Sequence, residues 1–244
     1  MENALVVVTG AGSGIGRAIT LGFAATGCRV VAADLNEPAG AATAAHDPEH
    51  ISALPVDIAD RASVDALHAR VQAELGTPTV LVNAAGWDET HQFIDATPEF
   101  AQKVVAINYL GPVNMCAAFL PAMIDAGGGS RVINLASDAG RVGSAGESIY
   151  AGAKGGVIAL TKSLARELAR HQITVNCVCP GPTDTPLFGA QPEKLQAALI
   201  KAIPFRRLAT PEEVAAPVLF FASAAASFIT GQVISVSGGL TMAG

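Results

Sequence analysis

The chain has 244 residues, half of them apolar and only 15% charged, which is enough for one large α/β domain with a full core. Its net charge of -6 argues against nucleic acid or an anionic membrane surface as a partner. No basic leader precedes the first apolar run, and no uninterrupted apolar stretch is long enough to span a bilayer, so we expect a cytoplasmic protein. The four cysteines and five histidines show no metal-ligand spacing, so we expect no metal.

Short apolar runs alternate with longer helical patterns along the whole chain. The runs cover residues 4–9, 29–34, 51–56, 79–83, 130–135, 174–179 and 232–236. Such strands predict a parallel sheet covered on both faces, and right-handed crossovers make it doubly wound. We therefore predict a single-domain Rossmann fold over residues 1–244, with about seven strands. Pro55 in the third run indicates an edge strand, which agrees with the order 3-2-1-4-5-6.

Two helix starts are visible in the sequence. Thr97 precedes Pro98 and Glu99, which supplies an N-cap, a first-turn proline and a favourable charge. Thr210 and Glu213 have the spacing of a capping box.

The first run leads into a glycine-rich turn, TGAGSGIG, at residues 9–16. Glycines here let the backbone turn sharply and approach a pyrophosphate at a helix N-terminus. A purely structural glycine turn is the alternative, but its place in the first strand–helix crossing favours dinucleotide binding. The residues expected to contact the cofactor are Gly10, Ser13, Gly14, Ile15 and Gly16.

Asp34 ends the second run, where a carboxylate accepts hydrogen bonds from the adenosine ribose and repels a 2′-phosphate. A helix-capping role is the alternative. Leu35 and Ser13, at positions where a basic residue would meet that phosphate, are uncharged. We therefore expect the cofactor to be NAD.

Tyr150 and Lys154 are four residues apart in a helical pattern at 148–171, so their side chains lie on one helix face. A free tyrosine titrates near pH ~10 and carries protons poorly at neutrality. A nearby ammonium favours the phenolate, so this pair predicts a general acid/base with a lowered pKa at Tyr150. From the pair alone, a surface tyrosine beside a solvated lysine is the simpler explanation.

With these motifs in place, the whole chain resembles the short-chain dehydrogenase/reductase family. The turn at 9–16 is similar to the family's cofactor loop, and NAAG at 83–86 to its N-N-A-G segment, with alanine at the second position. The residues that match its catalytic tetrad are Asn108, Ser137, Tyr150 and Lys154. The further residues that match its cofactor site are Asp57, Ile58, Asn83, Ala85, Pro180, Gly181, Thr183 and Thr185.

The resemblance implies a role for each member of the tetrad. Tyr150 exchanges a proton with the substrate oxygen as hydride moves to or from the nicotinamide, and Ser137 hydrogen-bonds that oxygen. Lys154 lowers the pKa of Tyr150 and holds the nicotinamide ribose, and Asn108 positions a water that links Lys154 to solvent. A buried polar residue bonded to its own helix is the alternative for Asn108. Gly111 and Pro112 just beyond it predict a local helix distortion.

Four residues at strand ends are candidates for contact with the substrate: Trp87, Asp88, Asp138 and Arg141. A loop and helix at about 183–210 are expected to form further walls. Segments such as AGWD at 85–88 are similar to family members that oxidise cyclic 3-hydroxyacyl-CoA thioesters, so we expect a cyclic or branched substrate of that class. The alternatives are a 3-oxoacyl-(acyl-carrier-protein) reductase, a dehydrogenase of small free secondary alcohols, and a non-catalytic dinucleotide-binding subunit. The resemblance also implies a homotetramer.

Overall fold

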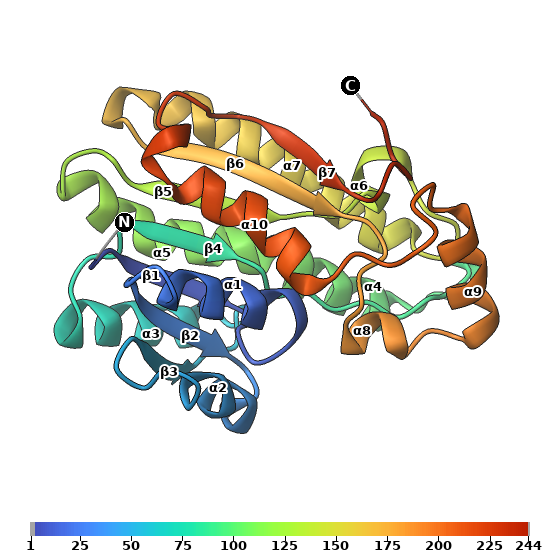
Figure 1. Ribbon diagram of the computed structural model, residues 1–244, viewed down its shortest axis with the longest axis horizontal. Coiled ribbons are helices and arrows are strands. Elements are labelled where there is room, and N and C mark those ends of the chain that lie inside the picture. The colour runs from blue at the N-terminus through green and yellow to red at the C-terminus, as the bar shows by residue number, and fades with distance from the viewer. Residues whose placement is uncertain (1–2, 244) are drawn as a thin grey trace.

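The chain forms one seven-stranded parallel sheet, and the computed structural model describes residues 3–243. The strands are β1 (Leu5–Thr9), β2 (Arg29–Asp34), β3 (Ile51–Pro55), β4 (Val80–Asn83), β5 (Arg131–Leu135), β6 (Thr174–Pro180) and β7 (Val233–Val236). Their spatial order β3-β2-β1-β4-β5-β6-β7 confirms the doubly wound topology (Figure 1). Pro55 pairs with Asp34 at the end of the edge strand β3, as its place in the sequence predicted.

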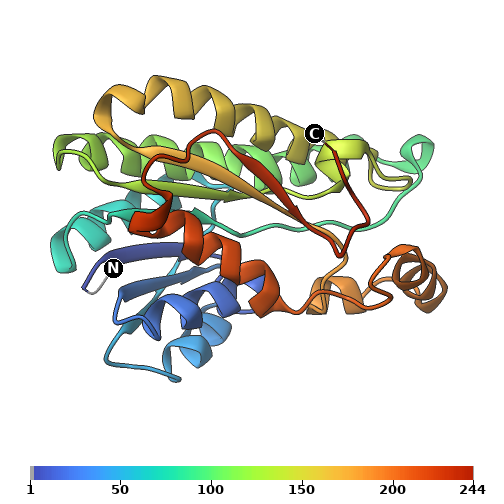
Figure 2. The same cartoon turned by 45° about the horizontal axis from the view of Figure 1, so that its top comes forward.

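Helices cover both faces of this sheet (Figure 2). One face carries α1 (Gly14–Ala24), α2 (Glu37–Ala44) and α10 (Pro211–Ala222), and the other carries α3 (Arg61–Glu74), α5 (Gly111–Asp125) and α7 (Ser148–Glu167). Successive side chains of a strand point to opposite faces. Val6 and Val8 therefore enter the core beneath α1 and α10, while Leu5 and Val7 enter the core beneath α3 and α5. This double burial explains why the strands are apolar throughout.

Both expected helix starts are confirmed. The Thr97 hydroxyl accepts a hydrogen bond from the Phe100 amide (3.2 Å) at the start of α4 (Pro98–Val105). At the start of α10 the Glu213 amide donates to the Thr210 hydroxyl (3.3 Å), and the Thr210 amide donates to the Glu213 carboxylate (2.8 Å).

A π-helical turn, η2 (Ala106–Leu110), joins α4 to α5 in one continuous helix. By length and composition alone, this 28-residue stretch, Pro98–Asp125, passes as a candidate membrane span, because an 18-residue window within it has a mean hydropathy of 1.4. The sequence analysis found no uninterrupted apolar stretch of this length, because Asn108 and Asn114 interrupt the apolar run. Neither residue ends the helix in the structure. Half of this 18-residue window is buried inside the protein, so we interpret the whole stretch as a core helix.

Short elements gather beyond the carboxyl ends of the strands. They include η1 (Phe93–Asp95), α6 (Ala139–Val142), α8 (Pro186–Gly189) and α9 (Glu193–Ala202), and Figure 1 shows α8 and α9 beyond the strand arrowheads. At the opposite end of the sheet, the helix predicted to reach residue 171 stops at Glu167. A 3₁₀ turn, η3 (Ala169–His171), follows it, and a second one, η4 (Ala224–Ala226), follows α10.

Candidate functional site

The glycine-rich turn packs so closely that side chains are excluded at two positions. A Cβ on Gly16 would lie 2.1 Å from the carbonyl oxygen of Gly10, and one on Gly10 (φ 68°) would lie 2.8 Å from the Cα of Ala85. Ser13 is the N-cap of α1, yet its side chain makes no capping bond. The first amides of α1 therefore remain available to an anionic ligand at the positive end of the helix.

The Asp34 carboxylate is fixed beside this turn by two backbone donors. The amides of Gly12 and Asn36 each donate to it at 2.8 Å, one to each oxygen. Asp34 lines the main pocket of the protein, and the Leu35 side chain next to it is 71% exposed. A carboxylate held in this way retains lone pairs for hydroxyl donors and presents a negative charge to any phosphate placed there.

The turn after β4 forms the next wall, and Thr9 holds it in place. The Thr9 hydroxyl accepts hydrogen bonds from the amides of Ala84 and Ala85, both at 3.1 Å. The Asn83 side chain lies behind this wall, where it donates to Asn134 Oδ1 (2.8 Å) and is almost completely buried. The structure therefore places Asn83 as a brace between β4 and β5, outside the pocket lining.

Asp57 and Ile58 also line the pocket, and their contact with an adenine stays a prediction. Asp57 Oδ1 accepts from the Ala59 amide (2.9 Å), and a Cβ on Gly111 would lie 2.5 Å from Ile58 Cδ1. Ile58 thus closes the wall against the start of α5.

Tyr150 lies in the first turn of α7, close enough to the Ser137 side chain for that side chain to act on its pKa. Ser137 Oγ accepts a hydrogen bond from the Ala139 amide (3.1 Å), which fixes its orientation after β5. Burial raises the pKa of Tyr150 above its usual range, and the negative charges of Glu147 and Asp88 add to the effect. The phenol is therefore protonated at neutral pH and can donate its proton to a carbonyl oxygen.

Lys154 lies one turn further along α7 with its side chain almost fully buried. Its Nζ donates to the carbonyl oxygen of Leu135 (2.9 Å) and lies 5.6 Å from the centroid of the Tyr150 ring. Burial lowers the pKa of Lys154 to about 8. The sequence argument expected a lowered pKa at Tyr150, but in this structure desolvation of the phenol outweighs any lowering by Lys154, whose ammonium bonds to a carbonyl.

Asn108 lies in the π-helical turn, which confirms the expected helix distortion. Its Nδ2 donates to the carbonyls of Trp87 (2.6 Å) and Val104 (2.9 Å), and its Oδ1 accepts from the Trp87 amide (3.2 Å). A Cβ on Gly86 would lie 3.1 Å from Asn108 Oδ1 and 3.4 Å from Lys154 Nζ, so the two polar groups approach each other around this glycine. The role of Asn108 in holding a water stays a prediction.

Three of the four substrate candidates line the main pocket: Trp87, Asp88 and Asp138. The ring of Trp87 is covered by Lys103, whose Nζ lies 3.6 Å from the ring centroid. Asp138 is buried and accepts a hydrogen bond from the hydroxyl of Ser235.

Arg141 does not line the pocket. It donates to Ser235 Oγ (2.9 Å) and to the carbonyl of Ala243, so it holds the C-terminal segment in place. Two more arginines near α9 are also bound by other groups of the protein: Arg206 donates to the carbonyl of Lys201, and Arg207 pairs with Glu213 (2.6 Å). The structure thus gives these arginines structural partners.

The pocket is one continuous cavity of about 1280 Å³ that runs from the glycine-rich turn to Tyr150 and on to α9. Nineteen of the expected site residues line it: Gly10, Ser13, Gly14, Ile15, Gly16, Asp34, Leu35, Asp57, Ile58, Ala85, Trp87, Asp88, Asp138, Tyr150, Lys154, Pro180, Gly181, Thr183 and Thr185. Sequence reasoning missed Lys103, Glu147, Leu240 and Thr241, because no motif marks them and they meet only in the folded chain. Among the described residues no cluster of histidine, cysteine and acidic side chains could hold a metal ion.

This lining fits a dinucleotide. The exposed amides at the start of α1 suit a pyrophosphate, and the Asp34 carboxylate suits the ribose hydroxyls beside it. Lys154 and the turn at Pro180 and Gly181 border the end of the pocket next to Tyr150, where the nicotinamide would be held. When bound, that group would accept or supply the hydride.

Comparisons with known proteins agree with this geometry. Residues 10–241 match the sequence model of the family described as enoyl-(acyl carrier protein) reductase. The chain is 38% identical to (3R)-3-hydroxyacyl-CoA dehydrogenase of Rattus norvegicus, over 99% of this chain and 98% of that protein. It is 42% identical to acetoacetyl-CoA reductase of Rhizobium meliloti, over 96% of this chain and 97% of that protein.

Among solved structures, the chain resembles a short-chain dehydrogenase/reductase, a glucose/ribitol dehydrogenase, from Brucella melitensis. The TM-score is 0.94 at 33% identity, over 100% of this chain and 98% of that one. The sheet order, the position of Tyr150 beside Ser137 in the pocket region and these likenesses lead to the same conclusion. The chain belongs to the short-chain dehydrogenase/reductase family and is an oxidoreductase that uses a nicotinamide dinucleotide and acts on hydroxyl groups.

Proposed function

We propose that the protein oxidises the secondary alcohol of a cyclic or branched 3-hydroxyacyl-CoA to the 3-oxoacyl-CoA, with NAD as the hydride acceptor. The observation that carries this proposal is the position of Tyr150, with Ser137 beside it, at the junction of two halves of one cavity. One half has the features of a dinucleotide site, and the other is walled by apolar side chains.

In the oxidation, Tyr150 removes the proton of the substrate hydroxyl, and Ser137 hydrogen-bonds the same oxygen. Lys154 favours this proton transfer as a buried cation on the same helix face, and its bond to Leu135 fixes its position. In the reverse direction the protonated Tyr150 returns the proton to the ketone oxygen. Because the pKa of Tyr150 is raised, the phenol is protonated at neutral pH, and this protonated form is the one that reduction requires.

The fixed carboxylate of Asp34 supports NAD over NADP. Its two backbone donors hold the carboxylate beside the turn that would bind the pyrophosphate. A 2′-phosphate would face this charge, and the neighbouring Leu35 and Asn36 offer no cation to offset it.

The shape and character of the far half support a ring-sized acyl group. Its apolar wall comes from α8, α9 and the C-terminal segment, with contributions from Trp87, Val142, Leu187, Phe188, Leu195, Leu199 and Leu240. The segments AGWD at 85–88 and 138–142 are similar to those of 2-hydroxycyclohexanecarboxyl-CoA dehydrogenase, an enzyme of anaerobic benzoate degradation. The names of the rat and Rhizobium relatives also support a 3-hydroxyacyl or 3-oxoacyl thioester. A role in the degradation of aromatic compounds in the cytoplasm is part of this proposal.

A 3-oxoacyl-(acyl-carrier-protein) reductase is the second candidate, because a protein of that name from Thermotoga maritima is 36% identical to this chain over 99% of both proteins. Such an enzyme would need NADPH and a basic patch for its acidic carrier. Asp34 and the net charge of -6 oppose both requirements. The complete tetrad opposes a non-catalytic role.

We also propose that the protein acts as a homotetramer, as its family resemblance implies. Large apolar side chains remain exposed on the helices and on the C-terminal segment, whose last residue, 244, lies outside the described part of the chain. They include Leu110, Phe220, Phe228 and Met242. Multi-angle light scattering should report four subunits at micromolar concentration, and a stable monomer would refute this assembly.

The decisive experiment compares three substrates with NAD and with NADP: 2-hydroxycyclohexanecarboxyl-CoA, its free acid and a linear 3-hydroxyacyl-CoA. We expect the cyclic thioester with NAD to give the highest kcat/KM, because each lost contact costs about 1–3 kcal/mol of transition-state binding. Equal turnover of the free acid or of an unrelated small alcohol would refute the thioester. Preference for NADPH and an acyl-carrier-protein substrate would establish the second candidate.

A further inference from the structure

Asp88 is a buried carboxyl group that the tetrad does not use. Its side chain is only 8% exposed, and its Oδ2 has no hydrogen-bond partner among the described residues. The backbone of the preceding residue, Trp87, is held on both sides by Asn108, so Asp88 starts from a fixed position. A buried polar atom without a partner is costly in free energy, and a ligand atom can satisfy it.

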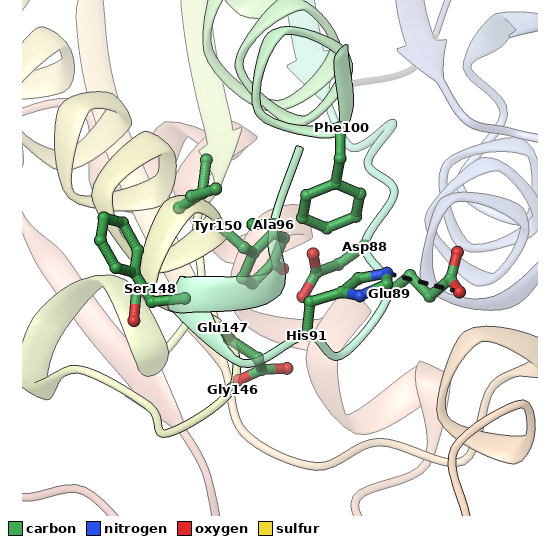
Figure 3. A pocket seen from close by; sticks show the side chains of 11 residues that line it. Asp88, Glu89, His91, Ala96, Phe100, Gly146, Glu147, Ser148 and Tyr150 are labelled. Carbon is green, nitrogen blue, oxygen red and sulfur yellow. Dashed lines mark ion pairs between the residues drawn. The ribbon is translucent and has the colours of Figure 1, made fainter. Parts of the chain in front are cut away.

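Asp88 faces the end of the pocket where the substrate would react. It lines the main cavity, and it also lines a small adjoining cavity of about 10 Å³ together with Tyr150, His91 and Glu147. Figure 3 shows the Asp88 carboxyl group between the Phe100 ring and the His91 imidazole. The rings of His91 and Phe100 are in edge contact, with centroids 4.4 Å apart, so they close this side of the pocket.

Two of the charged side chains near Asp88 are acidic, Glu89 and Glu147. Burial raises the pKa of Asp88 most strongly, and the charges of Glu147 and Glu89 raise it further, whereas the Glu89 backbone amide and His91 lower it. His91 is itself paired with Glu89, at 3.5 Å, as the dashed line in Figure 3 marks. The titratable and charged groups around Asp88 are Glu89, His91, Lys103, Glu147, Tyr150 and Lys154.

We propose that Asp88 is a specificity-determining residue: its protonated carboxyl group donates a hydrogen bond to the neutral acyl carbonyl of the substrate, and its ionised form excludes a free carboxylate from that place. The inference rests on the proposed 3-hydroxyacyl substrate. In such a substrate the acyl carbonyl is only two carbons from the carbon that carries the hydroxyl, so a group beside Tyr150 can contact it. A free acid would instead place a negative charge next to Asp88 and Glu147.

The protonation state of Asp88 makes this selectivity depend on pH. Burial, with help from Glu147, raises the pKa of Asp88 to about 7. Below this value the neutral acid can donate a hydrogen bond to a carbonyl or to a carboxylate. Above it the carboxylate repels an anionic substrate, so the preference for the thioester should increase as the pH rises from 6 to 8.

The test measures kcat/KM with NAD for a neutral short thioester, 3-hydroxybutyryl-N-acetylcysteamine, and for free 3-hydroxybutyrate. Both substrates react through the same tyrosine, so the ratio of their kcat/KM values cancels the ionisation of Tyr150. We expect the thioester-to-acid ratio of the unmodified enzyme to rise between pH 6 and pH 8. Asp88→Asn, which has the same shape and stays neutral, should lower the ratio at pH 8 about tenfold and remove its pH dependence.

Glu89→Gln is the matched control. It also removes one negative charge, at the next residue along the chain, but the Glu89 side chain is 65% exposed. Its ratio should stay within about twofold of the unmodified enzyme, since an exposed charge is screened by solvent. Circular dichroism and NAD binding measured by fluorescence establish that Asp88→Asn is folded. An unchanged ratio in a folded Asp88→Asn variant would overturn the role of Asp88 and leave the proposed function intact. Failure of the unmodified enzyme to oxidise any 3-hydroxyacyl thioester would overturn the proposed function, and the role of Asp88 with it.

Discussion

The two ends of the pocket are built in different ways. At the cofactor end, contacts come from the backbone: the glycine-rich turn excludes side chains, two amides hold Asp34, and Thr9 holds the turn after β4. At the substrate end, the walls are side chains of short elements, and α8 and α9 contain no fully buried residue. The cofactor end is therefore a rigid site for a constant ligand, whereas the substrate end can change by substitution without disturbing the sheet.

Tyr150 lies where the two ends meet, so its loss should have the largest effect. Tyr150→Phe should bind NAD normally but lose about 10²–10⁴-fold in kcat, because no other phenol can exchange the proton. Steady-state kinetics and NAD titration measure the two properties separately. Tyr109→Phe, at the only other tyrosine of the chain, is the control and should retain most activity. Near-native kcat in Tyr150→Phe would exclude this residue as the acid/base.

Asp34 tests whether the cofactor end alone selects the dinucleotide. Asp34→Ser combined with Leu35→Arg should shift the ratio of kcat/KM for NAD and NADP toward NADP by about 10–200-fold, since the repulsion is removed and a cation is added. The relative rates on different alcohols should not change, because both positions are remote from α9. Equal use of NADP by the unmodified enzyme would show that Asp34 does not select the cofactor.

The pH dependence should differ between the two directions of the reaction. Because the pKa of Tyr150 is raised, the phenol is protonated at neutral pH and must lose its proton before it can accept one from an alcohol. We expect kcat/KM for oxidation to rise about tenfold per pH unit from pH 6, with a bend near pH 8 where Lys154 loses its charge, and no such rise for reduction. A flat oxidation profile between pH 6 and 8 would contradict the raised pKa.

Leu199 tests the opposite end of the pocket. Leu199→Ala should lower kcat/KM for a cyclic thioester about tenfold, because part of the apolar wall is lost, while the KM for NAD stays unchanged. Lys194→Ala, on the exposed side of the same helix, is the control. An equal loss in both variants would mean that α9 itself was disturbed.

The smallest effect is expected at Thr210, which caps α10 behind the cofactor end. Thr210→Ala should lower the free energy of unfolding by about 1 kcal/mol, because the amide of Glu213 loses its acceptor. Urea denaturation followed by circular dichroism measures this change, and kcat should remain that of the unmodified enzyme. A large loss of activity without a loss of stability would connect this helix end to the site.

The sequence alone determined the parts of this protein that depend on local order. Fully apolar strands require burial on both faces, so their alternation with helices predicted the parallel sheet and the edge position of Pro55. The glycine-rich turn and Asp34 were also predictable, because their chemistry depends on a strand end and on backbone conformation. The spacing of Tyr150 and Lys154 placed both side chains on one helix face.

Only the tertiary structure decided what surrounds these groups. The sequence argument expected Lys154 to lower the pKa of Tyr150, but burial raises it. Desolvation depends on how deeply the folded chain buries the phenol, which the sequence alone does not give. Arg141 was expected to contact the substrate but binds Ser235 and Ala243, about a hundred residues away along the chain. Asp88 and Glu147 lie together beside Tyr150 although no motif links them. Electrostatic environment and partner choice depend on residues distant in sequence, which is why the substrate end could not be predicted from the sequence.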